Sequence, residues 1–165
     1  MMIGTSAVLS LRGGITLSYL GILAAASLTD WNTRVIPDFC PVMIMLLGVV
    51  TAWMYPEEHT LTERLIGALI ISVPMLFMAV MAGGAFGGGD IKLTAASGWL
   101  LGWQVMLPAA AIGILSGGSY CIWMLAKGKL TRKGRIAFGP FLAAGLSAAC
   151  LFGEEMLEWY LGRSS

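Results

Sequence analysis

The sequence predicts an all-α, polytopic membrane protein with six transmembrane helices. Hydrophobic residues make up 58% of the 165 residues, and the mean hydropathy is +0.82, whereas an ordinary soluble domain is roughly 45 to 50% apolar. Only 12% of the residues are charged, and the hydrophobic residues form blocks about as long as a bilayer is thick. These observations favour a single membrane-embedded domain over residues 1–165.

The expected helices follow the hydrophobic blocks in order. The first imitates a secretory signal, but five more apolar blocks follow it, so we expect it to be retained. The second begins after Pro37, which suits a rigid turn before a helix. The fourth opens at Asp90, and the sixth follows a basic stretch at 127–135. The six ranges are 5–29, 39–55, 62–82, 90–106, 107–126 and 138–158, most of them close to the ~20 residues that cross the hydrocarbon core.

Lysine and arginine residues indicate the orientation of these helices. When the loops are assigned alternately to two sides, seven basic residues near the helix ends fall on one side and three on the other. The richer side is expected in the cytoplasm, which places both termini outside. We expect the stretch KGKLTRKGR at 127–135 to anchor this topology and to contact anionic lipid, rather than to bind an acidic partner. The seven residues are Arg34, Lys92, Lys127, Lys129, Arg132, Lys133 and Arg135, and the three are Arg12, Arg64 and Arg163.

Composition also argues against several classes of site. Cys40, Cys121 and Cys150 stand singly in apolar stretches, and His59 is the only histidine. This pattern predicts neither a metal site nor a disulfide framework, and no cofactor is expected. The net charge of +1 gives no reason to expect a nucleic-acid partner. Nothing in the sequence specifies an oligomeric state.

Three acidic residues fall on the expected cytoplasmic side: Asp30, Asp38 and Asp90. A carboxylate inside a membrane helix costs roughly 2.5 to 3.5 kcal/mol at the centre and less near the interface, so it usually has a task or a partner. Asp90 suits a helix N-terminus, where negative charge is stabilised. Asp30 follows the expected end of the first helix, where the helix dipole disfavours a carboxylate. The pair is therefore harder to explain by capping than either member alone.

Two carboxylates within hydrogen-bond reach can divide the work of hydrolysis. They cannot both ionise cheaply, so one keeps a proton while the other deprotonates a water held between them. The protonated member donates to the substrate carbonyl, as in an aspartic protease. This chemistry needs neither a metal nor a histidine.

Three glycines precede Asp90, and two interpretations of them remain open. Gly87, Gly88 and Gly89 remove side-chain bulk and permit unusual backbone angles, which would let a substrate strand approach the main chain at a wet cavity. They equally suit a flexible turn or a tight helix crossing.

Three motifs resemble those of one family. GGGDIKLTAASGWLLG carries the GxGD signature of intramembrane aspartyl proteases, and together with DWNTRVIPD at 30–38 and FGPFLAAG at 138–145 it is similar to the type IV prepilin peptidase family. The resemblance implies six membrane helices and a catalytic pair formed by Asp30 and Asp90, with Gly87 and Gly89 shaping the active site. Supporting roles are implied for the motif residues Arg34, Ile36, Pro37, Lys92, Gly139 and Pro140.

Two positions depart from the family pattern, Asp38 in place of asparagine and Ala137 in place of proline. Asp38 is expected to cap the second helix, with binding of a basic leader peptide as the alternative. Neither departure affects the aspartate pair.

The resemblance further implies the substrate and the location. The substrate would be a membrane-inserted prepilin or pseudopilin precursor, cleaved at the cytoplasmic face of a bacterial or archaeal cell membrane. Larger bacterial members of the family carry a cytoplasmic cysteine-rich segment that is associated with N-methylation of the product. This chain has no paired cysteines and no long cytoplasmic loop, so it resembles the short, peptidase-only form. No methyltransferase activity is therefore expected.

Two rival interpretations remain. A non-enzymatic membrane protein, either a small transporter or a pilus-assembly scaffold, would use the aspartates to bind a cation or a partner. Presenilin-like and signal-peptide-peptidase-like proteases share GxGD, but their first aspartate normally follows a tyrosine, whereas Thr29 precedes Asp30 here.

Overall fold

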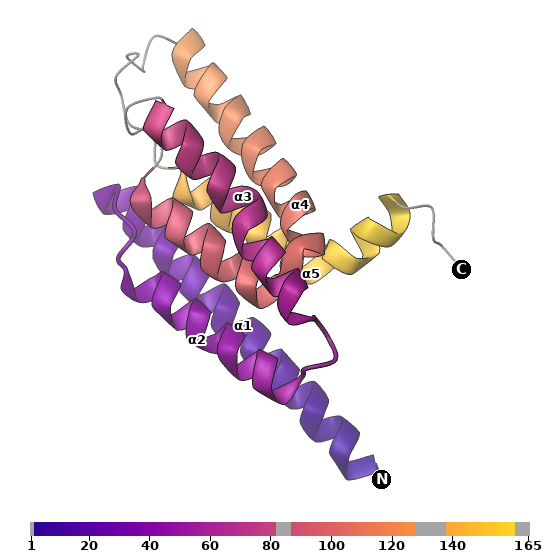
Figure 1. The fold of residues 1–165 in the computed structure, drawn as a ribbon. Coiled ribbons are helices and arrows are strands. Elements are labelled where there is room, and N and C mark those ends of the chain that lie inside the picture. The colour runs from indigo at the N-terminus through magenta and orange to yellow at the C-terminus, as the bar shows by residue number, and fades with distance from the viewer. Residues whose placement is uncertain (1, 82–86, 128–137, 161–165) are drawn as a thin grey trace.

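The computed structural model describes residues 2–81, 87–127 and 138–160. Within these residues the chain forms helices and no strands, so the all-α prediction is confirmed. The helices are α1 (Met2–Thr33), α2 (Phe39–Met54), α3 (Leu61–Met81), α4 (Gly88–Ala126) and α5 (Gly139–Tyr160), and Figure 1 shows them packed as one bundle.

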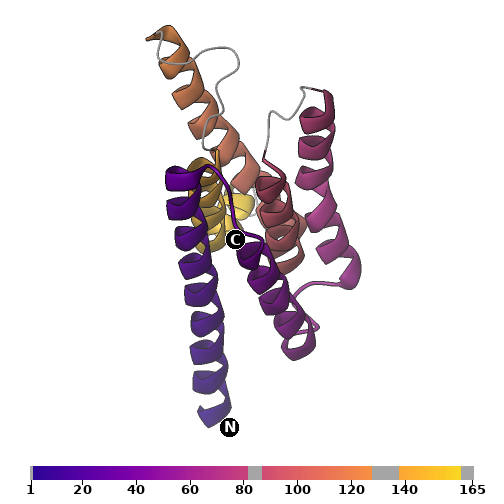
Figure 2. The ribbon, with the colours of Figure 1, turned by 90° about the vertical axis from the view of Figure 1, so that its left-hand side faces the viewer.

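Helix α4 contains a break at which the chain reverses direction. Gly102 has φ 75° and ψ 169°, which are not helical angles. The segment before Gly102 runs beside α3, and the segment after it runs back along the bundle, as both ribbon views show (Figures 1 and 2). The hydrophobic blocks predict two helices here, 90–106 and 107–126. The structure places the break at Gly102 instead, so the predicted boundary between residues 106 and 107 is wrong. The break lies at a glycine because a positive φ is costly for any residue with a Cβ.

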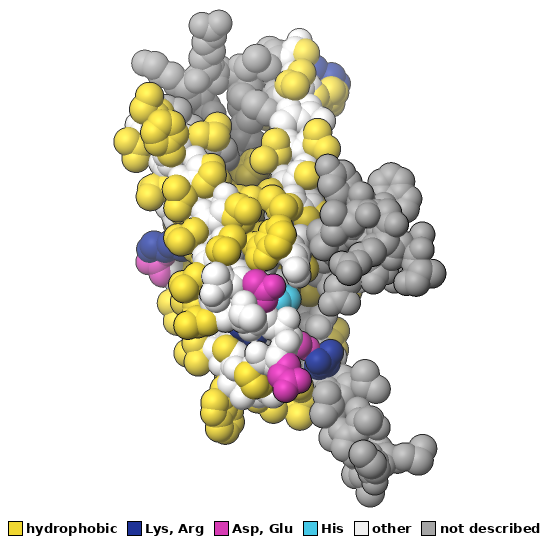
Figure 3. Space-filling view, turned by 45° about the vertical axis from the view of Figure 1, so that its right-hand side comes forward, with side chains coloured by type: hydrophobic (Ala, Val, Ile, Leu, Met, Phe, Trp, Pro, Cys, Tyr) yellow, Lys and Arg dark blue, Asp and Glu magenta, His cyan; other side chains and the backbone are white. Residues whose placement is uncertain are grey.

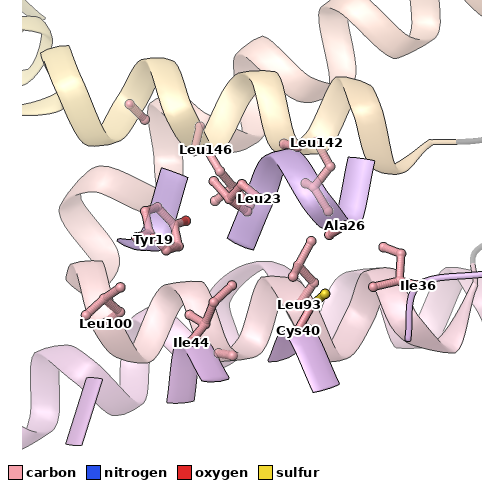
Figure 4. Packing of buried hydrophobic residues seen from close by; sticks show 14 of the residues in the cluster. Tyr19, Leu23, Ala26, Ile36, Cys40, Ile44, Leu93, Leu100, Leu142 and Leu146 are labelled. Atoms are coloured by element: carbon pink, nitrogen blue, oxygen red, sulfur yellow. The ribbon is translucent and has the colours of Figure 1, made fainter. Parts of the chain in front are cut away.

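The buried core cluster joins residues of α1, the α1–α2 loop, α2, α4 and α5, and the partly buried Ile70 and Ile71 of α3 pack against it. Helix α4 contacts α2, α3 and α5, while α1 packs against α5 and, less extensively, α2. Figure 4 shows the centre of this packing, where Tyr19 and Leu23 of α1 meet residues of α4 and α5. The buried cluster includes Tyr19, Leu23, Ala26, Ile44, Leu93, Leu100, Leu142 and Leu146.

Glycines allow the closest helix contacts. Gly67 of α3 and Gly98 of α4 face one another so closely that a Cβ on either would overlap the backbone of the other helix. Gly145 of α5 has the same relation to the backbone of α4 near Ala109. Close backbone approach without side chains is typical of helices that pack in a membrane.

The lengths and surfaces of the helices suit a bilayer. Three described segments are long and apolar enough to cross it: Leu11–Thr33, Leu61–Met81 and Gly88–Met124, the last of which contains the break. Helix α2 and the apolar part of α5 are shorter. Large hydrophobic side chains cover the outside of the bundle, among them Trp53 at 86% exposure and Val80 at 73%, and Figure 3 shows how much of one face they occupy.

Candidate active site

The first candidate residue, Asp30, is held by the start of another helix. It lies in the last turn of α1 and is 4% exposed, so it belongs to the helix rather than following its end as expected. Its Oδ2 accepts a hydrogen bond of 2.9 Å from the backbone N–H of Gly139, the first residue of α5. A Cβ on Gly139 would lie 2.6 Å from that same oxygen. Glycine is therefore the residue that lets α5 begin directly against Asp30.

The start of α5 explains why the Gly139 N–H is free for this bond. The N–H groups of Phe141 and Leu142 both donate to the carbonyl of Phe138, each at 3.1 Å. Pro140 has no N–H and is tolerated in the first turn of a helix. The motif containing Gly139 and Pro140 thus directs one backbone donor to Asp30.

The second candidate residue, Asp90, lies in the first turn of α4 and is 6% exposed. Its backbone N–H donates to the carbonyl of Gly87 at 3.1 Å, and its own carbonyl accepts a hydrogen bond of 2.7 Å from Thr94 Oγ1. Its Oδ1 is buried and has no hydrogen-bond partner among the described residues. A buried carboxyl oxygen without a hydrogen-bond partner is costly, so this oxygen is available for a hydrogen bond to another group.

The two aspartates lie at the same end of the bundle. They are near enough to interact electrostatically, although they are sixty residues apart in sequence. Ile36 in the α1–α2 loop, which is 5% exposed, lies between the segments that carry the two aspartates. A Cβ on Gly89 would lie 2.8 Å from the Cβ of Ile36, so the loop that follows Asp30 packs directly on the residue before Asp90.

The three glycines before Asp90 have different surroundings. Besides the contact of Gly89 with Ile36, a Cβ on Gly87 would lie 3.3 Å from Asp90 Oδ2, whereas one on Gly88 would meet nothing within 4 Å. Gly88 and Gly89 already belong to α4, and Gly102 is the only described glycine with a positive φ. None of the three has a positive φ, so the structure gives no sign of the unusual backbone angles that one of the two interpretations allowed, whereas absence of side-chain bulk fits Gly87 and Gly89. The preceding residues 82–86 lie outside the described part.

Asp38 does not cap α2 with its side chain, contrary to expectation. Its Oδ1 instead forms an ion pair of 2.7 Å with Lys92 Nζ of α4. Both side chains are well exposed, 71% for Asp38 and 59% for Lys92. The exposed ion pair therefore joins the α1–α2 loop to α4 at the surface, whereas the contact between Ile36 and Gly89 joins the same two segments in the interior.

The remaining supporting residues shape the α1–α2 loop. Pro37 precedes α2, and its carbonyl accepts a hydrogen bond of 3.1 Å from Cys40 N, as a rigid turn requires. Arg34 is exposed and has φ 54°, an uncommon conformation for a residue other than glycine. This conformation lets the chain turn at Arg34, directly after α1 ends at Thr33.

The sequence did not indicate the contribution of Thr94, and the supporting role expected of Ile36 did not specify its contact with Gly89. A threonine that bonds the carbonyl four residues earlier is common in helices, so Thr94 carries no distinctive signal. Among the described residues, His, Cys, Asp and Glu form no group of three that could hold a metal ion.

These features define a class: an all-α protein with helices long enough for a membrane and two buried aspartates at one end of the bundle. Residues 17–122, which include both aspartates, match the type IV leader peptidase family. Because this match covers more than half of the chain, the protein belongs to that family.

Curated relatives agree with this assignment. The chain is 29% identical to a prepilin leader peptidase/N-methyltransferase of Bacillus subtilis over 160 residues, which cover 92% of this chain and 63% of the relative. Proteins of the same name from Xanthomonas campestris and Pseudomonas aeruginosa are 32% and 30% identical, over 90% of this chain and 53% and 52% of theirs. The chain thus spans between half and two thirds of the length of these relatives. No solved structure is significantly similar to it.

Proposed function

We propose that this protein is an aspartic endopeptidase that removes the leader peptide of prepilin-like or pseudopilin-like precursors. The observation that supports the proposal is that Asp30 and Asp90 are both buried at the same end of the bundle, near enough to interact electrostatically. Family membership and the names of the relatives supply the substrate class.

The proposed reaction is direct hydrolysis of a peptide bond. The pair shares one proton, the carboxylate removes a proton from a water held between the two side chains, and the water oxygen attacks the scissile carbonyl carbon. The protonated aspartate donates to the carbonyl oxygen as the tetrahedral intermediate forms. The aspartate that took the proton from water then gives it to the amide nitrogen, and the C–N bond breaks. The hydroxyl formed from the carbonyl returns its proton to the other aspartate, so that the pair again shares one proton. The Gly139 N–H holds Asp30 in place, which leaves its other oxygen for this chemistry.

The proposed site lies at the cytoplasmic face of the cell membrane, in a chain that crosses the bilayer six times. Counting α4 as two helices on either side of Gly102 supports this number, although α2 is short, with 16 residues. The excess of lysine and arginine near the loops of this end supports the orientation, with both termini outside. The Asp30 and Asp90 end would then face the cytoplasm, where a precursor presents its leader.

Co-expression with a prepilin tests the proposal. Asp30→Asn and Asp90→Asn keep size and shape but remove the acid, so each should reduce leader removal by at least about 100-fold, the lower range for acid–base groups. Asp38→Asn is the matched control, because it changes an acid at the same end that lies outside the pair. Gel mobility of the precursor measures the outcome. Normal trimming by either Asp30→Asn or Asp90→Asn would refute the mechanism.

For this chain we propose peptidase activity without N-methyltransferase activity, although the names of the relatives include both. The support is the absence of paired cysteines in its sequence. Incubation of the purified protein with cleaved pilin and labelled S-adenosylmethionine tests this point, and label in the pilin would overturn it.

A further inference from the structure

A cavity of about 310 Å³ lies at the end of the bundle opposite the aspartates. Arg12 lines it, eighteen residues before Asp30 on the continuous helix α1, a separation of ~27 Å at the rise of an α-helix. Its walls come from α1, the end of α2 and the loop after it, α4 just before and after the break, and α5. The volume is in the range of small-ligand sites.

Charged and aromatic groups cluster in the wall of this cavity. Arg12 forms an ion pair with Glu58 and lies over the ring of Tyr55, 5.0 Å from its centroid. His59 also lines the cavity. Half of the Arg12 side chain remains exposed, so its guanidinium has donors left after pairing with Glu58.

A second arginine lies directly behind the wall. Arg64 of α3 is 1% exposed and donates to the carbonyl of His59 at 3.4 Å and to Thr51 Oγ1 at 3.3 Å, and both of these residues line the cavity. Its Nη2 is buried without a partner among the described residues. Arg12 and Arg64 thus lie at this wall of the cavity against one lining carboxylate, that of Glu58.

The lining of the cavity also includes several apolar residues. These are Ile15, Leu101, Val105, Ala149 and Leu151. A ligand that suits the whole lining carries both a negative charge and a hydrocarbon portion. A free inorganic anion would leave the apolar residues unused.

We propose that this cavity binds the phosphodiester headgroup of an anionic phospholipid, with Arg12 contacting the phosphate and the acyl chain lying against the apolar residues of the lining. A phosphodiester carries a single negative charge, which the donors of Arg12 that Glu58 leaves free can bind. Arginine is well suited to phosphate because its donors are planar and paired. The inference uses the proposed membrane location but not the aspartate chemistry.

Native mass spectrometry of the full chain, released from detergent and titrated with phosphatidylglycerol, tests the inference. One bound lipid per chain is expected, with weaker binding of phosphatidylcholine. Arg12→Gln should lower the affinity for phosphatidylglycerol about 10-fold or more, since it removes a charged hydrogen-bond donor. Lys92→Gln, which removes a cation that is paired with Asp38 and does not line the cavity, should bind like the native protein.

Two further variants keep the test decisive. Thr16→Phe fills the cavity without changing charge and should also weaken binding, whereas Asp30→Asn should bind phosphatidylglycerol normally even though it is expected to lose peptidase activity. The inference is overturned if Arg12→Gln and Thr16→Phe both bind like the native protein, or if phosphatidylcholine binds equally well. Displacement of the lipid by inorganic phosphate would likewise overturn it and assign the site to a free anion.

Discussion

At the scale of single residues, the contact between Ile36 and Gly89 controls how the two aspartate-bearing segments meet. Ile36 is buried, and the absence of a side chain on Gly89 lets it pack against the first turn of α4. The exposed ion pair of Asp38 and Lys92 joins the same segments, but exposed pairs contribute only about 0 to 1 kcal/mol. The apolar contact is therefore the stronger of the two connections.

Alanine at two neighbouring glycines should separate these effects. Gly89→Ala forces a Cβ against Ile36 and should lower the free energy of unfolding by about 1 to 3 kcal/mol, as overpacking does. Gly88→Ala meets nothing within 4 Å and should be neutral or slightly stabilising, because alanine favours a helix. Thermal unfolding in detergent measures both. Equal melting temperatures for the two variants would contradict this account of Gly89.

The candidate site was predictable at this scale only in part. Asp30 and Asp90 could be selected because the loops in which they fall carry the same charge bias. The roles of Gly139 and Asp38 depend on partners 109 and 54 residues away, so no local pattern could identify them. Asp38 was expected to cap α2 because aspartate commonly does so, but Lys92 competes for its carboxylate.

At the scale of elements, the break in α4 determines how the second half of the chain packs. Gly102 has a positive φ, and a Cβ on it would lie 3.1 Å from Nδ1 of His59. Next to the break, the carbonyl of Trp99 accepts a hydrogen bond of 3.3 Å from the buried Arg64. The break thus brings α2, α3 and α4 together around one arginine.

Replacement of Gly102 tests the importance of the break. Gly102→Ala should destabilise the protein by at least about 1 to 2 kcal/mol, the cost of a left-handed angle for a residue with a Cβ. Gly118→Ala, later in the same helix and with open space around it, should gain up to about 1 kcal/mol. Denaturation of the two variants in the same detergent compares them. The account fails if Gly102→Ala is as stable as Gly118→Ala.

Helix positions were largely predictable because hydrophobic blocks set them, and the boundary at Gly102 was not. The chain contains 22 glycines, and many of them lie inside helices in the structure. Among the described glycines, Gly102 is distinguished by its positive φ and by its closeness to His59, while the carbonyl of Trp99, three residues earlier, accepts a hydrogen bond from Arg64. Both partners come from outside α4.

At the scale of the whole molecule, the bundle has two chemically different ends. One carries the aspartate pair, and the other carries the cavity with Arg12, Glu58 and His59. The helices between them expose apolar side chains (Figure 3). This distribution suits a protein whose two ends meet water on opposite sides of a bilayer.

Thiol labelling of intact cells tests the proposed orientation. In a variant without Cys40, Cys121 and Cys150, a cysteine at the exposed position Glu57 should react with a membrane-impermeant reagent from outside. A cysteine at the exposed position Arg34 should react only after the membrane is permeabilised. The reverse pattern would place the aspartates outside and contradict cleavage at the cytoplasmic face.

The most direct test of the central claim, that Asp30 and Asp90 act as one catalytic pair, is to compare single and double variants. The rate of leader release from a membrane-inserted prepilin would be measured by mass spectrometry for the native protein, Asp30→Asn, Asp90→Asn and the double variant. Groups that act as a unit lose nearly the same rate singly and together. We therefore predict equal residual rates for all three variants. Losses that multiply in the double variant would mean that the two aspartates act independently, and would contradict the account.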